Sequence, residues 1–144
     1  MSRIALLLIV ALCLCNPALA QRTPPWQSLN DESLALFQQG KYDRSTEVAK
    51  KGLEMVERLQ GAEHQGAAIF MGRIAENYRQ QARFSEAGPL YESSLRIVER
   101  TLGPEHFRTA IVRTHYGVML VAQGKHVEAE QMLDRALDLR TRKR

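Results

Sequence analysis

Cysteine is scarce in this sequence: Cys13 and Cys15 are the only two among its 144 residues. Both lie in an N-terminal segment that we expect to be removed on export, so the mature chain would contain none. That excludes a disulfide and a thiolate metal site. Small exported proteins often depend on disulfides for stability. This chain must instead be held together by packing, and a domain of this length can bury enough surface for that.

The expectation of export comes from residues 1–20. Arg3 supplies a positive charge, Ile4–Leu14 is an unbroken apolar run of 11 residues, and the segment ends in Ala18-Leu19-Ala20. A charged part, an apolar part and a small-x-small end are typical of a secretory signal peptide. The run is too short to span a bilayer, which takes about 20 apolar residues. We expect cleavage after Ala20, a periplasmic or secreted protein, and no integral membrane segment in the mature chain.

Two other interpretations of this segment remain open. An uncleaved segment would act as an N-terminal anchor. A lipoprotein signal would place a lipid on Cys13 or Cys15, but such a site needs a small residue directly before the cysteine, and Leu12 and Leu14 stand there.

A strong excess of one charge is also missing. Over the whole chain 20 Lys and Arg residues face 16 Asp and Glu, a net charge of +4, and the signs are interspersed up to the basic end at residues 140–144. Basic tails can contact nucleic acid or anionic lipid. Cations at the end of a last helix also complement its dipole, which is the interpretation we favour. Helical-repeat RNA-binding proteins use another period, and export would separate the chain from cytoplasmic nucleic acid, so we expect no nucleic-acid partner.

Catalytic motifs are absent. The sequence has no H-E-x-x-H, no G-x-S-x-G, no Gly-rich phosphate loop, and no cysteine nucleophile after residue 20. We therefore expect no catalytic residues, no metal site and no cofactor. No segment shows sustained alternation of apolar and polar residues, so we expect no sheet and an all-α fold.

What the sequence does have is an internal repeat with a period of 42 residues. Three turn segments follow one another at this spacing, each after a glutamine: residues 40–42, 82–84 and 124–126. The linker at residues 61–64 recurs at residues 103–106, again 42 positions later. Because one period is kept through turn, helix and linker, the repeat is the main signal of the fold.

Each unit is predicted to contain two helices. In the middle unit an apolar stripe with the spacing i, i+3, i+4, i+7 precedes the turn, formed by Met71, Ile74, Ala75 and Tyr78. A second stripe runs from Leu90 to Leu102 and includes Leu95. We expect Tyr78 and Leu95 to be core residues.

Glycine and proline mark the expected helix boundaries. Gly40 and Gly124 suit the left-handed position just past a helix end. We expect Ser85 to cap the second helix of the middle unit, Pro89 to lie within its first turn, and Gly103-Pro104 to end it.

These residues resemble the tetratricopeptide repeat family, specifically the 42-residue variety found in kinesin light chains and many bacterial proteins. The matching positions are Ala75 and Gly117, the three turns, Ala87 and Ala129, Pro89-Leu90-Tyr91, the leucines at 53, 95 and 137, and the linker at residues 102–106. The resemblance implies a right-handed α-solenoid of about three helix-turn-helix repeats. These would be residues 26–64, 65–106 and 107–142, in a domain of residues 26–144 that follows a short extension at 21–25. It also implies a non-catalytic chain that binds a protein or peptide, without naming the partner.

Several positions depart from the family pattern. The first unit has Glu32, Ser33 and Ser45 at positions that are apolar or small in the other units, which suits a terminal repeat whose outer face meets water. Arg113 stands where an apolar residue is usual, and we expect its stem to lie along the seam with its head in solvent.

The histidines are interpreted as structural. His64 and His106 recur at the repeat period, which assigns both to the linkers rather than to a metal or acid–base role. His126 takes the turn position of Tyr42 and Phe84, so we expect it to pack as an aromatic.

In the family, the first helix of each repeat lines a concave surface on which partner peptides lie. That implies a partner-binding set of Asn30, Phe37, Arg73, Glu76, Arg79, Gln80, His115 and Val118, with Leu34, Asp31, Thr114 and Val121 nearby. Asn30 matches an asparagine common in the 42-residue variety. The arginines could pair with a carboxylate of a partner; alternatively, Arg73, Glu76 and Gln80 form a solvated helix face with local pairs.

The end of the third unit is a second candidate surface. Its last helix has no following helix in the sequence, and Met132, Leu133 and Leu139 are apolar. This edge could support weak self-association or be covered by a partner, which would make the chain a structural self-associating unit. Acidic and basic neighbours could equally leave a monomer.

Overall fold

The computed structural model describes the backbone of residues 23–141 and the side chains up to residue 138. Over this range the chain forms six helices and no strand, which confirms the all-α prediction. The helices are α2 (Gln27–Gln38), α3 (Tyr42–Gln60), α4 (Gln65–Gln80), α5 (Phe84–Leu102), α6 (Phe107–Ala122) and α7 (His126–Thr141). None of the six described helices combines the length and the apolar composition that a membrane span requires. The predicted signal peptide, residues 1–20, lies outside the described residues.

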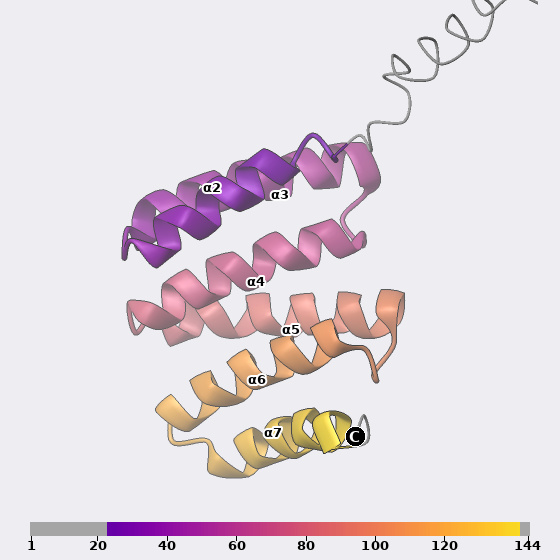
Figure 1. The fold of residues 1–144 in the computed structure, drawn as a ribbon. Coiled ribbons are helices and arrows are strands. Elements are labelled where there is room, and N and C mark those ends of the chain that lie inside the picture. The colour runs from indigo at the N-terminus through magenta and orange to yellow at the C-terminus, as the bar shows by residue number, and fades with distance from the viewer. Residues whose placement is uncertain (1–22, 142–144) are drawn as a thin grey trace, which may run out of the picture.

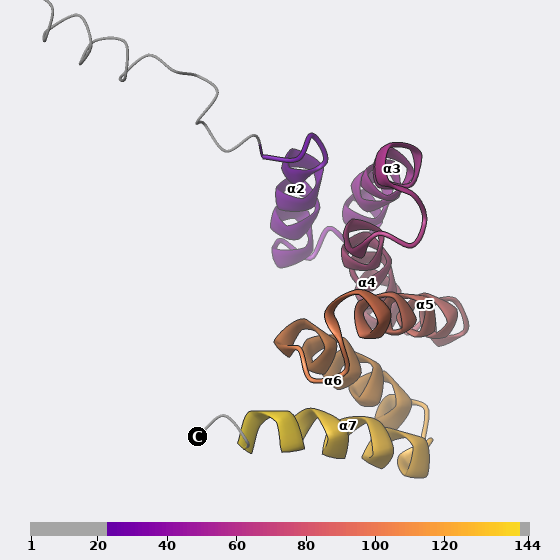
Figure 2. The same ribbon diagram turned by 90° about the vertical axis from the view of Figure 1, so that its right-hand side faces the viewer.

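The helices form a stack of antiparallel pairs, as an α-helical repeat solenoid does (Figure 1). Each helix packs against the next one along the chain, from α2 on α3 to α6 on α7. The first helices of successive pairs also touch, α2 against α4 and α4 against α6. Figure 2 shows α2 and α6 on one side of the stack and α3 and α5 on the other. The first helices therefore line a common side.

The turn inside each pair keeps the same backbone geometry. In each turn a backbone N–H donates a hydrogen bond to the carbonyl of the residue five positions earlier, in the preceding helix. The Lys41 N–H, for example, donates to the Leu36 carbonyl at 2.9 Å. This arrangement places one residue in the left-handed region. Gly40 and Gly124 occupy it with φ of 72° and 75°, as predicted, but the middle turn has Ala82 there with φ of 57°. A side chain in this region is strained relative to glycine.

The linkers between pairs end in histidine caps. His64 precedes α4, and its Nδ1 accepts a hydrogen bond from the backbone N–H of Gly66 at 3.0 Å. His106 does the same before α6 with the N–H of Arg108, at 3.2 Å. Their assignment to the linkers explains their recurrence, although the capping bond was not anticipated. The expectation for His126 was wrong, because its side chain is exposed.

The core follows the predicted stripes. Tyr78 and Leu95 are both only 8% exposed, which confirms them as core residues. Trp26 meets the ring of Phe70 edge-on, with 6.0 Å between the ring centroids, and so joins the start of α2 to α4. Gly52 of α3 lies directly under the same ring, where an added Cβ would come within 2.3 Å of it. Close packing of Trp26 and Gly52 against Phe70 holds the first helix pair against the second.

Two of the three polar residues that were expected to face water in the first unit do not. Glu32 is exposed, but Ser33 and Ser45 are fully buried. The hydroxyl of Ser45 donates to the Ser33 carbonyl at 2.8 Å and accepts from the amide of Asn77 at 3.0 Å. The Ser33 hydroxyl donates to the Asn30 carbonyl of its own helix at 2.9 Å, whereas Asn77 comes from α4, so the next unit supplies a partner for the buried Ser45 hydroxyl.

The expectation that the head of Arg113 lies in solvent was also wrong. Arg113 is 4% exposed, and its guanidinium donates to the Pro104 carbonyl at 2.9 Å and to the carboxylate of Glu99 at 2.7 Å. A buried arginine needs such partners, and here α5 and the preceding linker supply them.

The predicted start of α5 was wrong as well. The helix begins at Phe84, with Arg83 as its N-cap residue and no side-chain cap, so Ser85 is inside the helix. Pro89 is the sixth residue of α5 and lies beyond its first turn. The shared turn geometry, rather than a capping side chain, sets where this helix starts. Gly103, with φ of 93°, ends α5 as predicted.

Candidate functional site

A cavity of about 330 Å³ opens between α4 and α6, with α5 as its floor. Its wall and floor are largely apolar, formed by Ile69, Val98, Leu102, Ile111 and Val112. Polar groups converge on the same space from three helices: Asn30, Arg73, Glu76 and His115. A concave, mostly apolar space with a few fixed polar groups is the usual form of a binding site, and this one is at the small end of the range.

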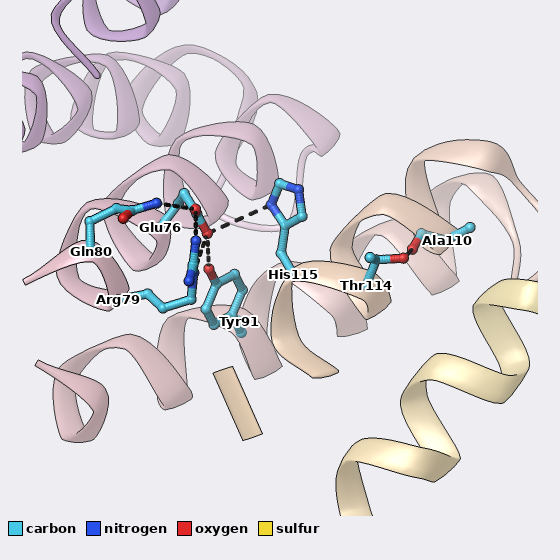
Figure 3. A network of polar contacts seen from close by, with 7 residues as sticks. All are labelled: Glu76, Arg79, Gln80, Tyr91, Ala110, Thr114 and His115. Carbon is cyan, nitrogen blue, oxygen red and sulfur yellow. Dashed lines mark hydrogen bonds and ion pairs between the residues drawn. The ribbon is translucent and has the colours of Figure 1, made fainter. Parts of the chain in front are cut away.

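Glu76 is the centre of the polar groups (Figure 3). Its residue is 7% exposed, yet its carboxylate accepts four hydrogen bonds. Arg79 donates from Nε at 3.0 Å and from Nη2 at 2.5 Å, Gln80 donates at 3.2 Å, and the Tyr91 hydroxyl donates at 2.5 Å. Two of these donors are on α4 itself and the third, Tyr91, reaches up from α5.

These contacts determine the charge of the carboxylate. Burial by itself disfavours ionisation of Glu76, but the hydrogen bonds from Arg79 and Tyr91 and the positive charge of Arg79 outweigh it and lower the pKa of Glu76 to about 2. Burial raises the pKa of the Tyr91 hydroxyl above its ordinary value, and its hydrogen bond to Glu76 raises it further. At neutral pH the site therefore holds an ionised, fully bonded carboxylate and a protonated phenol.

His115 connects the third unit to this cluster. Its Nδ1 lies 3.8 Å from Oε2 of Glu76, a contact that becomes an ion pair when the imidazole is protonated. About half of its side chain is exposed at the rim of the cavity. Figure 3 shows the imidazole directed from α6 toward the Glu76 carboxylate.

Arg73 differs from Arg79 because its contact within the described chain is with an aromatic ring rather than with a carboxylate. Its guanidinium carbon lies 5.3 Å from the centroid of the Phe37 ring, within the range of a cation–π contact. Its Nε is buried and has no hydrogen-bond partner among the described residues. Burial lowers the pKa of Arg73, and the nearby Glu76 charge opposes that shift. Arg73 is thus a half-buried cation that has donors left for a ligand.

The structure brings together only some of the residues predicted for the concave surface. Asn30, Arg73, Glu76 and His115 line the cavity. Arg79 and Gln80 hold Glu76 in place, and Phe37 supports Arg73. Val118 is exposed outside the cavity. The alternative that placed Glu76 on a solvated helix face is wrong for this residue, because Glu76 is buried.

Sequence reasoning missed the floor of the cavity. Tyr91, Val98 and Leu102 were placed in the apolar stripe of a second helix, but the resemblance assigned binding residues to first helices only. Tyr91 was the residue that could have been found, because a tyrosine on a buried stripe needs a partner for its hydroxyl.

The predicted association edge is only partly open. Met132 packs against the core, and Leu133 lies against Gly117, where an added Cβ would come within 2.8 Å of it. Both side chains are half-buried. The side chain of Leu139 lies outside the described residues. Within the described part of the chain, no group of three or more His, Cys, Asp and Glu is placed to hold a metal ion.

Comparison with known proteins agrees with this architecture. The chain matches the tetratricopeptide repeat family twice, over residues 27–66 and over residues 67–142. Among curated proteins no sequence matches it. Of the solved structures, BtubC (BKLC) from P. vanneervenii is similar, with 21% sequence identity and a TM-score of 0.74 over 85% of this chain and 50% of that one.

A putative kinesin light chain from Podosopora anserina with nearly identical TPR-like repeats is also similar. It has 19% sequence identity and a TM-score of 0.73 over 82% of this chain and 56% of that one. This chain thus spans about half the length of each solved chain, and the likeness concerns the fold. With two repeat matches that together cover the three helix pairs, this chain belongs to the tetratricopeptide repeat family.

Proposed function

We propose that this chain binds a segment of a partner protein along the side lined by its first helices, with the α4–α6 cavity at the centre of the contact. Tetratricopeptide repeats generally act as protein-interaction modules. The observation that carries the proposal is the state of Arg73: it is half-buried beside an apolar cavity, and its Nε has no partner within the described chain. A buried donor without a partner is costly, and a ligand that supplies an acceptor removes that cost.

The cavity and Arg73 together indicate the chemistry of the bound segment. A volume of about 330 Å³ lined by Ile69, Val98 and Ile111 takes an apolar side chain. A carboxylate next to that side chain would pair with Arg73, and Arg108 also lines the cavity. Glu76 does not repel such a ligand strongly, because Arg79 already neutralises it. We therefore propose an apolar anchor flanked by an acidic residue.

The site supports binding rather than catalysis. A general acid or base works best when its pKa lies near the operating pH. The contacts of Glu76 move its pKa to about 2, and those of Tyr91 move its pKa upward, so both move away from neutrality. These groups are fixed structural donors and acceptors, which agrees with the family's usual role as a non-catalytic scaffold.

A display library of short random peptides tests this function. The chain should enrich peptides that place Asp or Glu beside a large apolar residue. Arg73→Glu should weaken the selected peptides by at least about tenfold, the cost of losing a charge-assisted contact. The matched control is Arg44→Glu on α3, whose side chain is about 71% exposed. Equal binding by the two variants, or enrichment without acidic residues, would contradict the proposal.

We also propose that the protein acts outside the cytoplasm, on the basis of the signal-like composition of residues 1–20. The intact mass of the exported form should correspond to a chain that starts at Gln21. A mass that retains residues 1–20, or one that includes a lipid on Cys15, would refute this.

A further inference from the structure

Exposed apolar side chains gather on the last helix pair. The described part of the chain has seven large apolar residues that are exposed, and six of them lie on α6 and α7: Phe107, Ile111, Val118, Val121, Val127 and Leu137. Among the described helices α7 packs only against α6. Figure 2 shows α7 at one end of the stack, with no other described helix beyond it. By their equivalence to positions that a helix covers in the earlier units, we group the exposed residues Val118, Val121, Glu130, Asp134 and Leu137 as the end face.

The repeat itself shows what kind of group covers such a face. Leu95 of α5, a helix on which α6 packs, is 8% exposed, whereas Leu137, its equivalent 42 residues later, is 54% exposed. Val118 is equivalent to Glu76, which contacts His115 of the next unit. Val121 occupies in the third unit the position that Phe37 occupies in the first. The Phe37 ring contacts the guanidinium of Arg73, which belongs to the second unit. In the first and second units, residues at these positions therefore contact the first helix of the next unit.

The polar residues of the end face differ in one respect from those at the contact between the second and third units. At the seam between the second and third units, Glu92 of α5 accepts a hydrogen bond from the Tyr116 hydroxyl at 2.7 Å. Gly88 lies one turn earlier, where an added Cβ would be 3.8 Å from the Met119 methyl group. The third unit has Asp134 at the position of Glu92 and Glu130 at the position of Gly88. A helix on the end face would meet two carboxylates where α6 meets one.

We propose that the end face binds an amphipathic helix of a partner protein that has Lys or Arg at the two positions held by Tyr116 and Met119 in α6. Its apolar side packs on Leu137, Val118 and Val121, and its two cations face Asp134 and Glu130. This is a second surface with a charge preference opposite to that of the cavity at Arg73. The chain would then connect two partners, one through an acidic segment and one through a basic helix.

A second copy of this chain fits the end face less well. In a continued stack the covering helix would be α2 of that copy, in which the equivalents of Tyr116 and Met119 are Glu32 and Ala35. Glu32 is exposed and would face Asp134, and like charges across an interface are unfavourable. The charges therefore favour a different protein as the occupant.

Two synthetic peptides with the sequence of residues 105–124 test this. The basic peptide has Tyr116→Arg and Met119→Lys, and the acidic peptide has Tyr116→Glu and Met119→Glu. Fluorescence anisotropy with the purified chain should show saturable binding of the basic peptide and binding of the acidic peptide that is weaker by at least about tenfold. In the double variant Glu130→Lys, Asp134→Lys the preference should reverse. Both residues are exposed, so this variant should fold normally.

Two further variants locate the bound peptide. Leu137→Glu should abolish binding, while Leu59→Glu on α3, an equally exposed leucine outside the end face, should leave it unchanged. Equal binding of the two peptides, or no reversal in the double variant, would overturn the proposal. If the Arg73→Glu variant failed to bind the basic peptide, the peptide would be located in the cavity, and this result would also overturn the proposal. A concentration-dependent dimer that Leu137→Glu dissociates would make a second copy the occupant.

Discussion

Replacing Glu76 with glutamine should remove a pH-dependent part of the stability of this protein. The pKa of Glu76 is lowered from 4.5 to about 2 in the folded chain, although burial by itself would raise it. Because the folded state holds this proton less tightly than the unfolded state, ionisation of Glu76 stabilises the fold above pH 4.5. That contribution decreases as the pH falls from about 4.5 to about 2. A difference of this size corresponds to about 3 kcal/mol at neutral pH.

Chemical denaturation followed by circular dichroism, from pH 2 to pH 7, measures this effect. At pH 7, Glu76→Gln should lower the free energy of unfolding by up to about 3 kcal/mol, because Arg79 loses its ion pair and the Tyr91 hydroxyl loses a charged acceptor. Near pH 2 the two proteins should differ by less than about 0.5 kcal/mol, since Glu76 is then about half protonated in the folded chain and almost fully protonated in the unfolded chain.

The difference between the two stability curves is the informative quantity, because other carboxylates with lowered pKa values, such as Glu63 and Glu86, titrate in both proteins. The matched control is Glu47→Gln on α3, whose carboxylate is exposed; its curve should follow that of the unmodified chain. A constant difference between pH 2 and pH 7 would show that Glu76→Gln acts through packing. A difference below about 0.5 kcal/mol at pH 7, the usual range for a surface change, would refute the reasoning.

Three further substitutions test the fold by the same denaturation assay. Leu95→Ala should cost about 2–5 kcal/mol, the usual range for a buried leucine, and a cost below about 0.5 kcal/mol would mean that the helical register is wrong. Arg113→Ala should cost about 3 kcal/mol, because it leaves the Pro104 carbonyl and the Glu99 carboxylate without their donor; an unchanged midpoint would assign Arg113 to the solvent-facing position. Ala82→Gly should stabilise the chain by about 0.5 kcal/mol, because relief of the left-handed strain exceeds the extra flexibility of an unfolded glycine; a loss of stability would contradict this.

The cavity at Arg73 and the end face depend on different features of the stack. The cavity lies between the first helices of the second and third units. The end face lies on α6 and α7, and its acidic pair, Glu130 and Asp134, is not repeated in the second unit, where Gly88 and Glu92 stand. Binding at one surface can therefore be altered by substitution without altering the other.

The helices and their order could be predicted from the amino-acid sequence. The 42-residue period located the turns at residues 40, 82 and 124, and the apolar stripes identified Tyr78 and Leu95 as core residues. This succeeded because helix periodicity and glycine conformation are local properties, which adjacent residues express directly. The prediction that Ser85 caps the start of α5 was wrong, because the turn rather than a side-chain cap sets where this helix starts.

Which polar residues are buried, and what they bind, depends on how the helices stack. The Asn77 amide meets the Ser45 hydroxyl across 32 sequence positions, and Arg113 meets Glu99 across 14. The Tyr91 hydroxyl reaches Glu76 across 15 positions and so turns a residue of a helix face into a buried carboxylate with a lowered pKa. A polar residue on an apolar stripe is compatible with solvent or with burial. The choice depends on whether a neighbouring helix brings a partner within hydrogen-bond distance, and that is a property of the stacking.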